Sequence, residues 1–282
     1  MRSRPFASTA RGVALVRALE MTRPAAERVA SDPYAASFTQ PLSVLGMRTM
    51  VATGLSNLMG IEAMMNFAIA RERHIGDIMK REAAGDARQM VILGAGFDTR
   101  AYRLPVAGLP VFEVDHPVTQ AQKRQALRGV LDPLPANVVF VPVDFDRDDL
   151  GQQLVLAGYD AHKRTLFVWQ GVTMYLTPQG IDHTLAFIAG HAAPGSSVVF
   201  DFMDSAALEG GAMASLKFFT RALGEAMTFG IDAAQIGPFL ERRGFTAVEC
   251  IDGPMLARLY FTGGNAGRPM ATGVGIASAV VR

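Results

Sequence analysis

The sequence predicts an α/β protein with a mostly parallel sheet of seven strands, wrapped by helices and preceded by a helical segment. Two observations lead to this fold class. From residue 89 onward, short apolar runs alternate with helical segments, which is the pattern of parallel strands joined by crossover helices. Residues 1 to about 85 contain no such alternation and have helical apolar spacing. We therefore divide the chain into a helical segment over 1–85 and a sheet domain over 86–282.

Short apolar runs mark the strands of the sheet domain. The predicted strands are 90–93, 111–114, 138–143, 165–169, 197–203, 247–251 and 273–281. The predicted helices between them are 117–130, 148–157, 178–191 and 232–243. Residues 206–230 interrupt the alternation and, being rich in Ala, Gly, Met and Phe, predict a helical insertion near the site. No clear crossover helix joins the last two strands, so we expect a hairpin that makes the last strand antiparallel.

The composition is that of a soluble globular protein. Half of the residues are hydrophobic, 19% are charged, and the net charge is +1, so nothing indicates a nucleic-acid partner. The sequence has no apolar run of roughly 18 residues, the length needed to span a membrane. The single Cys250 excludes an internal disulfide and fits a reducing compartment, so we expect a cytoplasmic protein. The histidines show no ligand-like pairing, so we expect no metal site.

The segment from Leu42 to Ala70 is poor in charge and rich in methionine. Its charged residues are Arg48 and Glu62. Methionine side chains adapt to irregular gaps, so this segment fits a helical core, a subunit contact or the wall of an apolar pocket. We expect core or subunit contact, and with the latter a homodimer.

A glycine turn after the first strand of the sheet domain is the main candidate site. The strand over 90–93 stops at Gly94-Ala95-Gly96, where two glycines allow a sharp turn and close approach to a ligand. The next strand ends in Asp115, about 20 residues beyond Gly94, the spacing at which a carboxylate reaches a ribose hydroxyl. Together these features predict a nucleotide site.

The kind of nucleotide follows from what the turn lacks. A dinucleotide site needs a third glycine and a long helix under the pyrophosphate. Here Thr99 takes that place, and Pro105 and Pro110 follow too soon for a long helix. S-adenosylmethionine carries no phosphate and needs carboxylates for its hydroxyls and its amine. Carboxylates stand at or near three successive strand ends, namely Asp98, Asp115 and Asp144. An NAD-dependent oxidoreductase is the rival interpretation.

Four motifs resemble the leucine carboxyl methyltransferase family, in particular its bacterial branch, which includes polyketide O-methyltransferases. They are Gly94-Ala-Gly-Phe-Asp-Thr-Arg100, Phe112-Glu-Val-Asp-His-Pro117, Val143-Asp-Phe145 and Gly171-Val-Thr-Met-Tyr-Leu-Thr-Pro178. The resemblance extends from about Arg11 to the last strand. It implies a class I methyltransferase (Rossmann-like) fold, with residues 1–85 as a helical cap over the substrate. It also implies S-adenosylmethionine as methyl donor and a carboxyl or hydroxyl oxygen of a small molecule as acceptor.

The same resemblance assigns the cofactor-binding residues by position. Arg73 would pair with the donor's carboxylate, which suits a bidentate guanidinium. Gly94 would contact the methionyl part, Asp115 the ribose, and Asp144 with Phe145 the adenine edge. The remaining cofactor-binding candidates are Ala95, Gly96, Asp98 and Gln170. Gln170 departs from the family, which usually has Glu there to contact the donor's amine, so an ion pair is lost.

The acceptor is expected to be a carboxylate. A carboxylate is ionised near neutral pH, whereas a phenol or alcohol needs a base, for which His74 and His116 are the nearby candidates. The motifs offer no evident catalytic base, and this favours a carboxylate, as in polyketide or other secondary-metabolite biosynthesis. Arg100 and Tyr175 are the candidate acceptor-binding residues. The alternatives are O-methylation of a hydroxyl and, because of Gln170, a donor-binding protein without activity.

Overall fold

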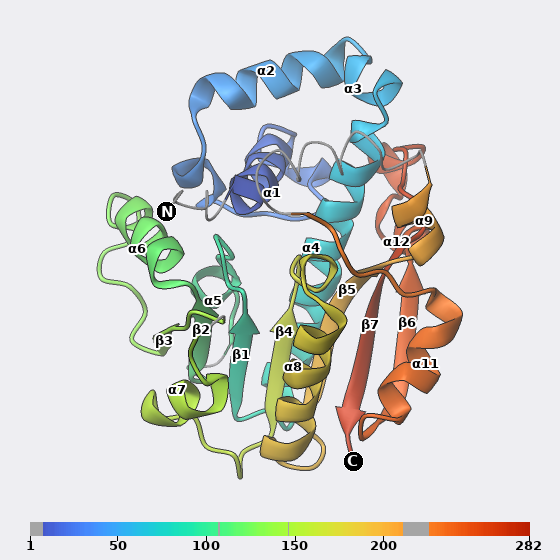
Figure 1. The fold of residues 1–282 in the computed structure, drawn as a ribbon. Coiled ribbons are helices and arrows are strands. Elements are labelled where there is room, and N and C mark those ends of the chain that lie inside the picture. Colours follow the sequence, from blue (N-terminus) through green and yellow to red (C-terminus); the bar gives the residue numbers. More distant parts are fainter. Residues whose placement is uncertain (1–7, 107, 146, 211–225) are drawn as a thin grey trace.

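The computed structural model describes residues 8–106, 108–145, 147–210 and 226–282 and contains one sheet of seven strands in the order β3-β2-β1-β4-β5-β7-β6 (Figure 1). The strands are β1 (Gln89–Leu93), β2 (Val111–Asp115), β3 (Val138–Pro142), β4 (Thr165–Trp169), β5 (Ser197–Met203), β6 (Phe245–Asp252) and β7 (Val274–Val281). β1 to β5 pair in parallel, whereas β7 lies between β5 and β6 and pairs antiparallel with both. The predicted sheet with an antiparallel last strand is confirmed.

The connection between β6 and β7 differs from the expected hairpin loop. It contains helix α12 (Gly253–Tyr260) and the short 3₁₀ helix η5 (Gly263–Asn265). The Asp252 side chain caps α12 by accepting the backbone N–H of Met255 at 2.7 Å, and Pro254 occupies the first turn. A capped first turn with proline, where no backbone N–H is needed, favours a helix. It explains why a helix forms in a connection for which the sequence predicted none.

Helices cover both faces of the sheet, and most begin where the sequence predicts them. They are α5 (Arg100–Arg103), α6 (Pro117–Leu127), α7 (Leu150–Leu156), α8 (Pro178–His191), α9 (Ser205–Glu209) and α11 (Ala233–Glu241). The hydroxyl of Thr177 accepts the N–H of Gly180, as expected for the cap of α8. Of the predicted insertion over 206–230, α9 forms the beginning and 226–230 is not helical, while 211–225 lies outside the described residues.

The N-terminal segment is helical, and it consists of α1 (Ser8–Glu20), η1 (Ala25–Glu27), η2 (Ala35–Phe38), α2 (Pro41–Ala52), α3 (Leu55–Leu58) and α4 (Ile61–Ala84). The long helix α4 passes from this segment onto one face of the sheet (Figure 1). Its Ile75 and Met79 are in the same buried cluster as Met90 and Ile92 of β1. The N-terminal segment and the sheet therefore share one continuous core on this face.

β1 is buried on both faces of the sheet, as its apolar run predicts. Met90 and Ile92 belong to the core on the α4 side, while Val91 and Leu93 belong to the core on the opposite side. Alternate side chains of a strand point to opposite faces, so a strand with helices on both sides must be apolar throughout. β1 is thus held firmly from both sides, which fixes the position of the turn that follows it.

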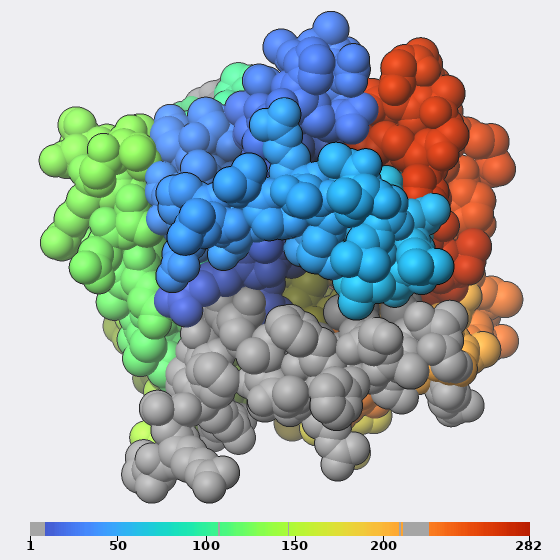
Figure 2. All heavy atoms as spheres, turned by 90° about the horizontal axis from the view of Figure 1, so that it is seen from above, coloured from blue at the N-terminus to red at the C-terminus, as the bar shows by residue number. Residues whose placement is uncertain are grey.

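Helices α2 and α3 lie on the outside of the N-terminal segment, at the top of Figure 1, and face the viewer in Figure 2. No side chain of α2 is buried, and Leu42 and Leu58 are 78% and 85% exposed. Of the two roles that we expected, core contact fits α4, where Met65 is buried, and does not fit α2, while subunit contact stays a prediction. Within the described ranges, no helix has the length and apolar content needed to cross a membrane.

Candidate active site

The Gly94 turn directly follows β1 at the carboxyl edge of the parallel strands. Gly94 and Gly96 have φ values of 64° and 44°, in the left-handed region that side chains with a Cβ rarely adopt. A Cβ added at Gly94 would lie 2.5 Å from Cγ2 of Val172, in the segment after β4. Both glycines are therefore required by the backbone, and the turn packs closely against the neighbouring strand connection.

Asp115 ends β2 and is bonded to the Gly94 turn. One carboxylate oxygen accepts the N–H of Gly96, and the other accepts the N–H of His116 at 2.6 Å. Burial raises the pKa of Asp115 above its usual value, although these two N–H groups oppose that shift. The Thr119 side chain is a third hydrogen-bond partner, so the carboxylate is fixed in place, and its oxygens still have capacity to accept a ligand's hydroxyl. The structure thus brings Asp115, Ala95 and Gly96 together as the sequence predicts.

Gln170 directly follows β4, which pairs with β1. Its Nε2 donates to Oε2 of Glu72 at 3.4 Å, while its Oε1 is buried and has no hydrogen-bond partner among the residues that the structure describes. Buried polar atoms are rarely left without a partner in folded proteins. The unpaired oxygen is a ready acceptor for a ligand that carries N–H donors, such as an ammonium group.

Arg71 of α4 is a candidate site residue that the sequence analysis missed. Its guanidinium pairs with the fully buried carboxylate of Asp201 in β5. The other oxygen of Asp201 accepts the N–H of Gly171 at 2.6 Å. Asp201 therefore ties α4, β5 and the turn after β4 together, and it places Arg71 next to Gln170 and Gly171.

Arg73 does not lie at this site, which corrects our expectation. Its Nε donates to Asp77 at 2.7 Å, and its side chain lies half exposed over the ring of Tyr260 in α12. Two residues along a helix rotate the side chain by about 200°, so Arg73 points away from the face that carries Arg71. The spacing of Phe67, Arg71 and Ile75 along the buried face of α4 is a signal that could have pointed to Arg71.

Arg100 is wholly buried behind the Gly94 turn, so the expected contact with an acceptor is not supported. Its guanidinium donates to both carboxylate oxygens of Asp98. Burial would raise the pKa of Asp98, but the charge of Arg100 and its hydrogen bonds outweigh burial and hold that pKa far below its usual value. Both oxygens of Asp98 are held in this way, whereas Nη1 of Arg100 is buried without a hydrogen-bond partner among the described residues, and Asp98 is therefore a support of the turn.

A buried ion-pair network continues from Arg100 into the N-terminal helices. Its further members are Arg17, Asp32, Glu72 and Arg103. Arg17 also donates to the carbonyl oxygen of Phe97, within the loop that contains the Gly94 turn, at 2.6 Å. The network thus connects α1 and α4 to the back of the candidate site.

The remaining predicted contacts lie along the same edge or beside it. The backbone N–H of Val143 donates to the carbonyl of Asp115 at 3.0 Å. Half-buried Asp144 and exposed Phe145, which follow β3, therefore lie next to Asp115, the residue predicted to bind the ribose. Tyr175 belongs to the 3₁₀ helix η3 (Thr173–Tyr175) and is half buried against the core. These positions fit a ligand that extends from the Gly94 turn toward β3.

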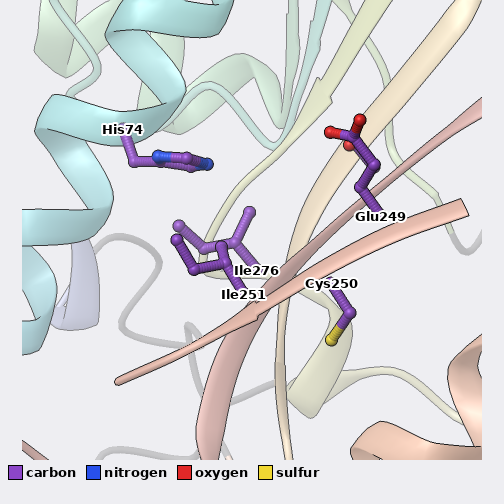
Figure 3. A pocket seen from close by; sticks show the side chains of 6 residues that line it. His74, Glu249, Cys250, Ile251 and Ile276 are labelled. Atoms are coloured by element: carbon purple, nitrogen blue, oxygen red, sulfur yellow. The ribbon is translucent and has the colours of Figure 1, made fainter. Parts of the chain in front are cut away.

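The two histidines considered as bases have other contacts. The Nδ1 atom of His116 accepts the N–H of Val118 and caps α6. His74 contacts the hydroxyl of Tyr260 at 3.0 Å and lines a pocket against β6 and β7, which lie four and three strands from β1 (Figure 3). Burial lowers the pKa of His74. Among the residues that the structure describes, no group of His, Cys, Asp and Glu could hold a metal ion.

Comparisons with known proteins identify the family of this chain. A sequence profile of the leucine carboxyl methyltransferase family matches residues 10–189. A putative S-adenosyl-L-methionine-dependent methyltransferase from Mycolicibacterium smegmatis is 32% identical over 78% of this chain and 74% of its own length. A putative methyltransferase of the same description from Bacillus subtilis, YktD, is 36% identical over 48% of this chain. That match spans only 45% of the Bacillus protein.

Solved structures agree on the fold. A possible exported protein from Bordetella parapertussis superposes with a TM-score of 0.52 at 14% identity, covering 95% of this chain and 79% of that one. An O-methyltransferase family protein from Burkholderia thailandensis gives a TM-score of 0.50 at 14% identity, over 78% of this chain and 59% of that one. On the profile and the Mycolicibacterium relative together, the chain belongs to the leucine carboxyl methyltransferase family of S-adenosylmethionine-dependent methyltransferases.

Proposed function

We propose that this chain is an O-methyltransferase that transfers a methyl group from S-adenosylmethionine to a small-molecule carboxylate. The observation that carries the proposal is the edge formed by the Gly94 turn, the Asp115 carboxylate and the unpaired oxygen of Gln170. The glycine turn lets a ligand approach the backbone closely, the carboxylate can accept from hydroxyls, and the amide oxygen can accept from an ammonium. A site for S-adenosylmethionine needs all three close together.

The donor's parts match the residues in order along this edge. Arg71 would pair with the donor's carboxylate, since it is the buried guanidinium next to the turn after β4. Gln170 would accept from the ammonium, Asp115 from the ribose hydroxyls, and Asp144 with Phe145 would border the adenine. With this arrangement the methyl group would lie near the Gly94 turn, on the side of the N-terminal helices.

The structure gives little support to the NAD alternative. The helix after the glycine turn, α5, spans Arg100–Arg103 and contains four residues. Dinucleotide sites place the pyrophosphate at the amino end of a long helix, whose aligned peptide groups supply partial positive charge. A single turn of helix that is already capped by Asp98 provides little of that field.

A carboxylate acceptor fits the groups near the site. S-adenosylmethionine supplies an electrophilic methyl group, so this chain's residues need to align the acceptor oxygen with that methyl group and exclude water. A carboxyl group with an ordinary pKa of about 4 is already ionised at neutral pH and needs no base. The contacts of His74 and His116 favour such an acceptor over a phenol or alcohol. A polyketide acid is one such substrate, and Tyr175 is the described side chain that we assign to its binding.

The test is to find the product and determine its bond. Carboxylic acids, including polyketide acids, and matched phenols are incubated with methyl-labelled S-adenosylmethionine. We expect a labelled methyl ester that releases methanol in base, with a single-turnover rate nearly flat from about pH 6 to about pH 8.5. A base-stable methyl ether whose rate rises about tenfold per pH unit would contradict the carboxylate assignment. Calorimetry with S-adenosylhomocysteine and NAD tests the donor, and tight S-adenosylhomocysteine binding without any product would indicate an inactive binder.

A further inference from the structure

Glu72 is the neighbour that determines how Gln170 is oriented. It lies on α4, is 2% exposed, and its two oxygens face different partners. Oε1 pairs with Arg103 and lies 3.7 Å from Nε of Arg100 and 4.0 Å from Nη1 of Arg17. Oε2 accepts from Nε2 of Gln170 at 3.4 Å. Glu72 therefore connects the buried arginines to the residue proposed to contact the donor's ammonium.

Glu72 is ionised at neutral pH. Burial alone would raise its pKa, but the guanidinium groups of Arg100, Arg17 and Arg103 outweigh burial and hold the pKa below its usual value. An ionised carboxylate only accepts hydrogen bonds, whereas an amide has a donating NH₂ end and an accepting oxygen end. The NH₂ end of Gln170 must therefore face Glu72, whichever way the amide could otherwise turn.

The consequence of this orientation is the unpaired oxygen. With Nε2 held by Glu72, Oε1 of Gln170 faces the other way and is buried without a donor. A glutamate at position 170 would instead place two carboxylates in contact, and like charges at such a distance cannot both remain ionised. A glutamine is thus the side chain that both satisfies Glu72 and presents an acceptor to the site.

We infer that Glu72 is a positioning residue for the methyl donor: it turns the Gln170 amide so that its oxygen accepts a hydrogen bond from the donor's ammonium group. This inference rests on the proposed function, in which Gln170 contacts that ammonium. Glu72 acts through Gln170 and does not touch the donor itself.

The first test is Glu72→Gln. The new amide at position 72 keeps its oxygen toward Arg103, so its NH₂ end faces Gln170. Gln170 must then reverse and present its own NH₂ to the donor's ammonium. We expect the Kd of S-adenosylhomocysteine, measured by calorimetry, to rise roughly tenfold or more. Glu82→Gln, a half-buried position on the same helix, is the matched control and should leave the Kd within about twofold.

A second ligand separates positioning from general damage. 5′-Methylthioadenosine shares the adenosine and the sulfur of the donor and lacks the ammonium and carboxylate. Glu72→Gln should change its Kd by no more than about twofold, because the adenosine contacts at Asp115 are unaffected. An equal loss of both ligands would mean that Glu72 merely supports the fold, and this outcome would overturn the inference.

The exchange variant Glu72→Gln with Gln170→Glu provides a rescue. It keeps the number of charges and every donor–acceptor pairing, since the amide at 72 now donates to the carboxylate at 170. We expect its Kd for S-adenosylhomocysteine to return to within about threefold of the wild type. If Glu72→Gln alone does not fold, the exchange variant decides: binding of 5′-methylthioadenosine without S-adenosylhomocysteine overturns the inference. Failure of the proposed function looks different, because then the wild type binds neither ligand.

Discussion

Asp115 is the residue whose removal most directly tests where the donor's ribose binds. Both of its oxygens are already anchored by backbone N–H groups, from Gly96 and His116. Ribose hydroxyls would use the acceptor capacity that these N–H groups and the Thr119 side chain leave on the carboxylate. Asp115→Ala removes these acceptors and leaves both N–H groups of the turn without their partner.

The magnitude follows from the bonds that are lost. A hydrogen bond to a charged group contributes about 1.5–3 kcal/mol, so two hydroxyls bound to Asp115 correspond to about 3–6 kcal/mol at most. Water replaces part of this in the variant, so we take about 1.4 kcal/mol, a tenfold rise in Kd, as the minimum effect. The loosened Gly94 turn can only add to it.

The pH dependence of stability and of donor binding gives a second, independent test of Asp115. Burial raises the pKa of Asp115, so the folded protein holds this proton more tightly than the unfolded chain. Stability contributed by Asp115 therefore increases as pH falls through the raised pKa, and decreases as pH rises above the unfolded value. Donor binding should run the opposite way, because the ionised carboxylate is the better acceptor: affinity falls as pH falls.

The assay is calorimetry with S-adenosylhomocysteine at neutral and mildly acidic pH, with circular dichroism to confirm folding. Glu241→Ala, an exposed position on α11, is the control and should bind like the wild type. An unchanged Kd in folded Asp115→Ala would refute the ribose assignment. Equal pH dependence in the wild type and in Asp115→Ala would show that another group titrates.

Two further predictions concern the walls of the site. Arg71→Lys keeps a cation beside Asp201 but should raise the Kd of S-adenosylhomocysteine about tenfold, because a lysine cannot form a bidentate pair. Arg73→Lys should leave this Kd within about twofold. A larger rise for Arg73→Lys than for Arg71→Lys in calorimetry would assign the pairing with the donor's carboxylate to Arg73. Gly94→Ala should lower the unfolding free energy by about 1–3 kcal/mol, as measured by urea denaturation, because of its positive φ and the contact with Val172. Adding Val172→Ala should restore only part of this loss, since it relieves the contact and not the backbone strain, and full restoration would show that φ costs nothing here.

Local sequence features were enough to predict most of the fold. The strands over 165–169 and 197–203 have the predicted bounds, because each is an apolar run between clear turn signals. The missed helix α12 shows the limit of such reasoning. Its capping residue and proline are present in the sequence, but its eight residues lie in a connection that is also long enough for a loop.

The candidate site divides in the same way. Gly94 and Gln170 directly follow a strand and Asp115 ends one, so each could be found from its strand. Helical spacing marks Arg71 as a buried residue of α4, but its pairing with Asp201 could not be predicted, because the two residues are 130 positions apart and meet only when α4 packs against β5. Glu72 and Gln170, 98 residues apart, are a pair of the same kind. Contacts between distant segments have no local signature in one sequence.

The charge balance of these distant contacts explains why an amide follows β4. Behind and beside the Gly94 turn, each buried guanidinium has a carboxylate partner: Arg17 with Asp32, Arg71 with Asp201, Arg100 with Asp98, and Arg103 with Glu72. An uncompensated buried charge is costly, so an extra carboxylate at position 170 would destabilise the site until a cation arrived. The amide of Gln170 avoids that cost in the empty protein and keeps an acceptor for the donor's ammonium. In the proposed site, the positive charge of the donor would enter surroundings that are balanced without it, and the donor's affinity would come from oriented dipoles and from the pairing of its carboxylate with Arg71.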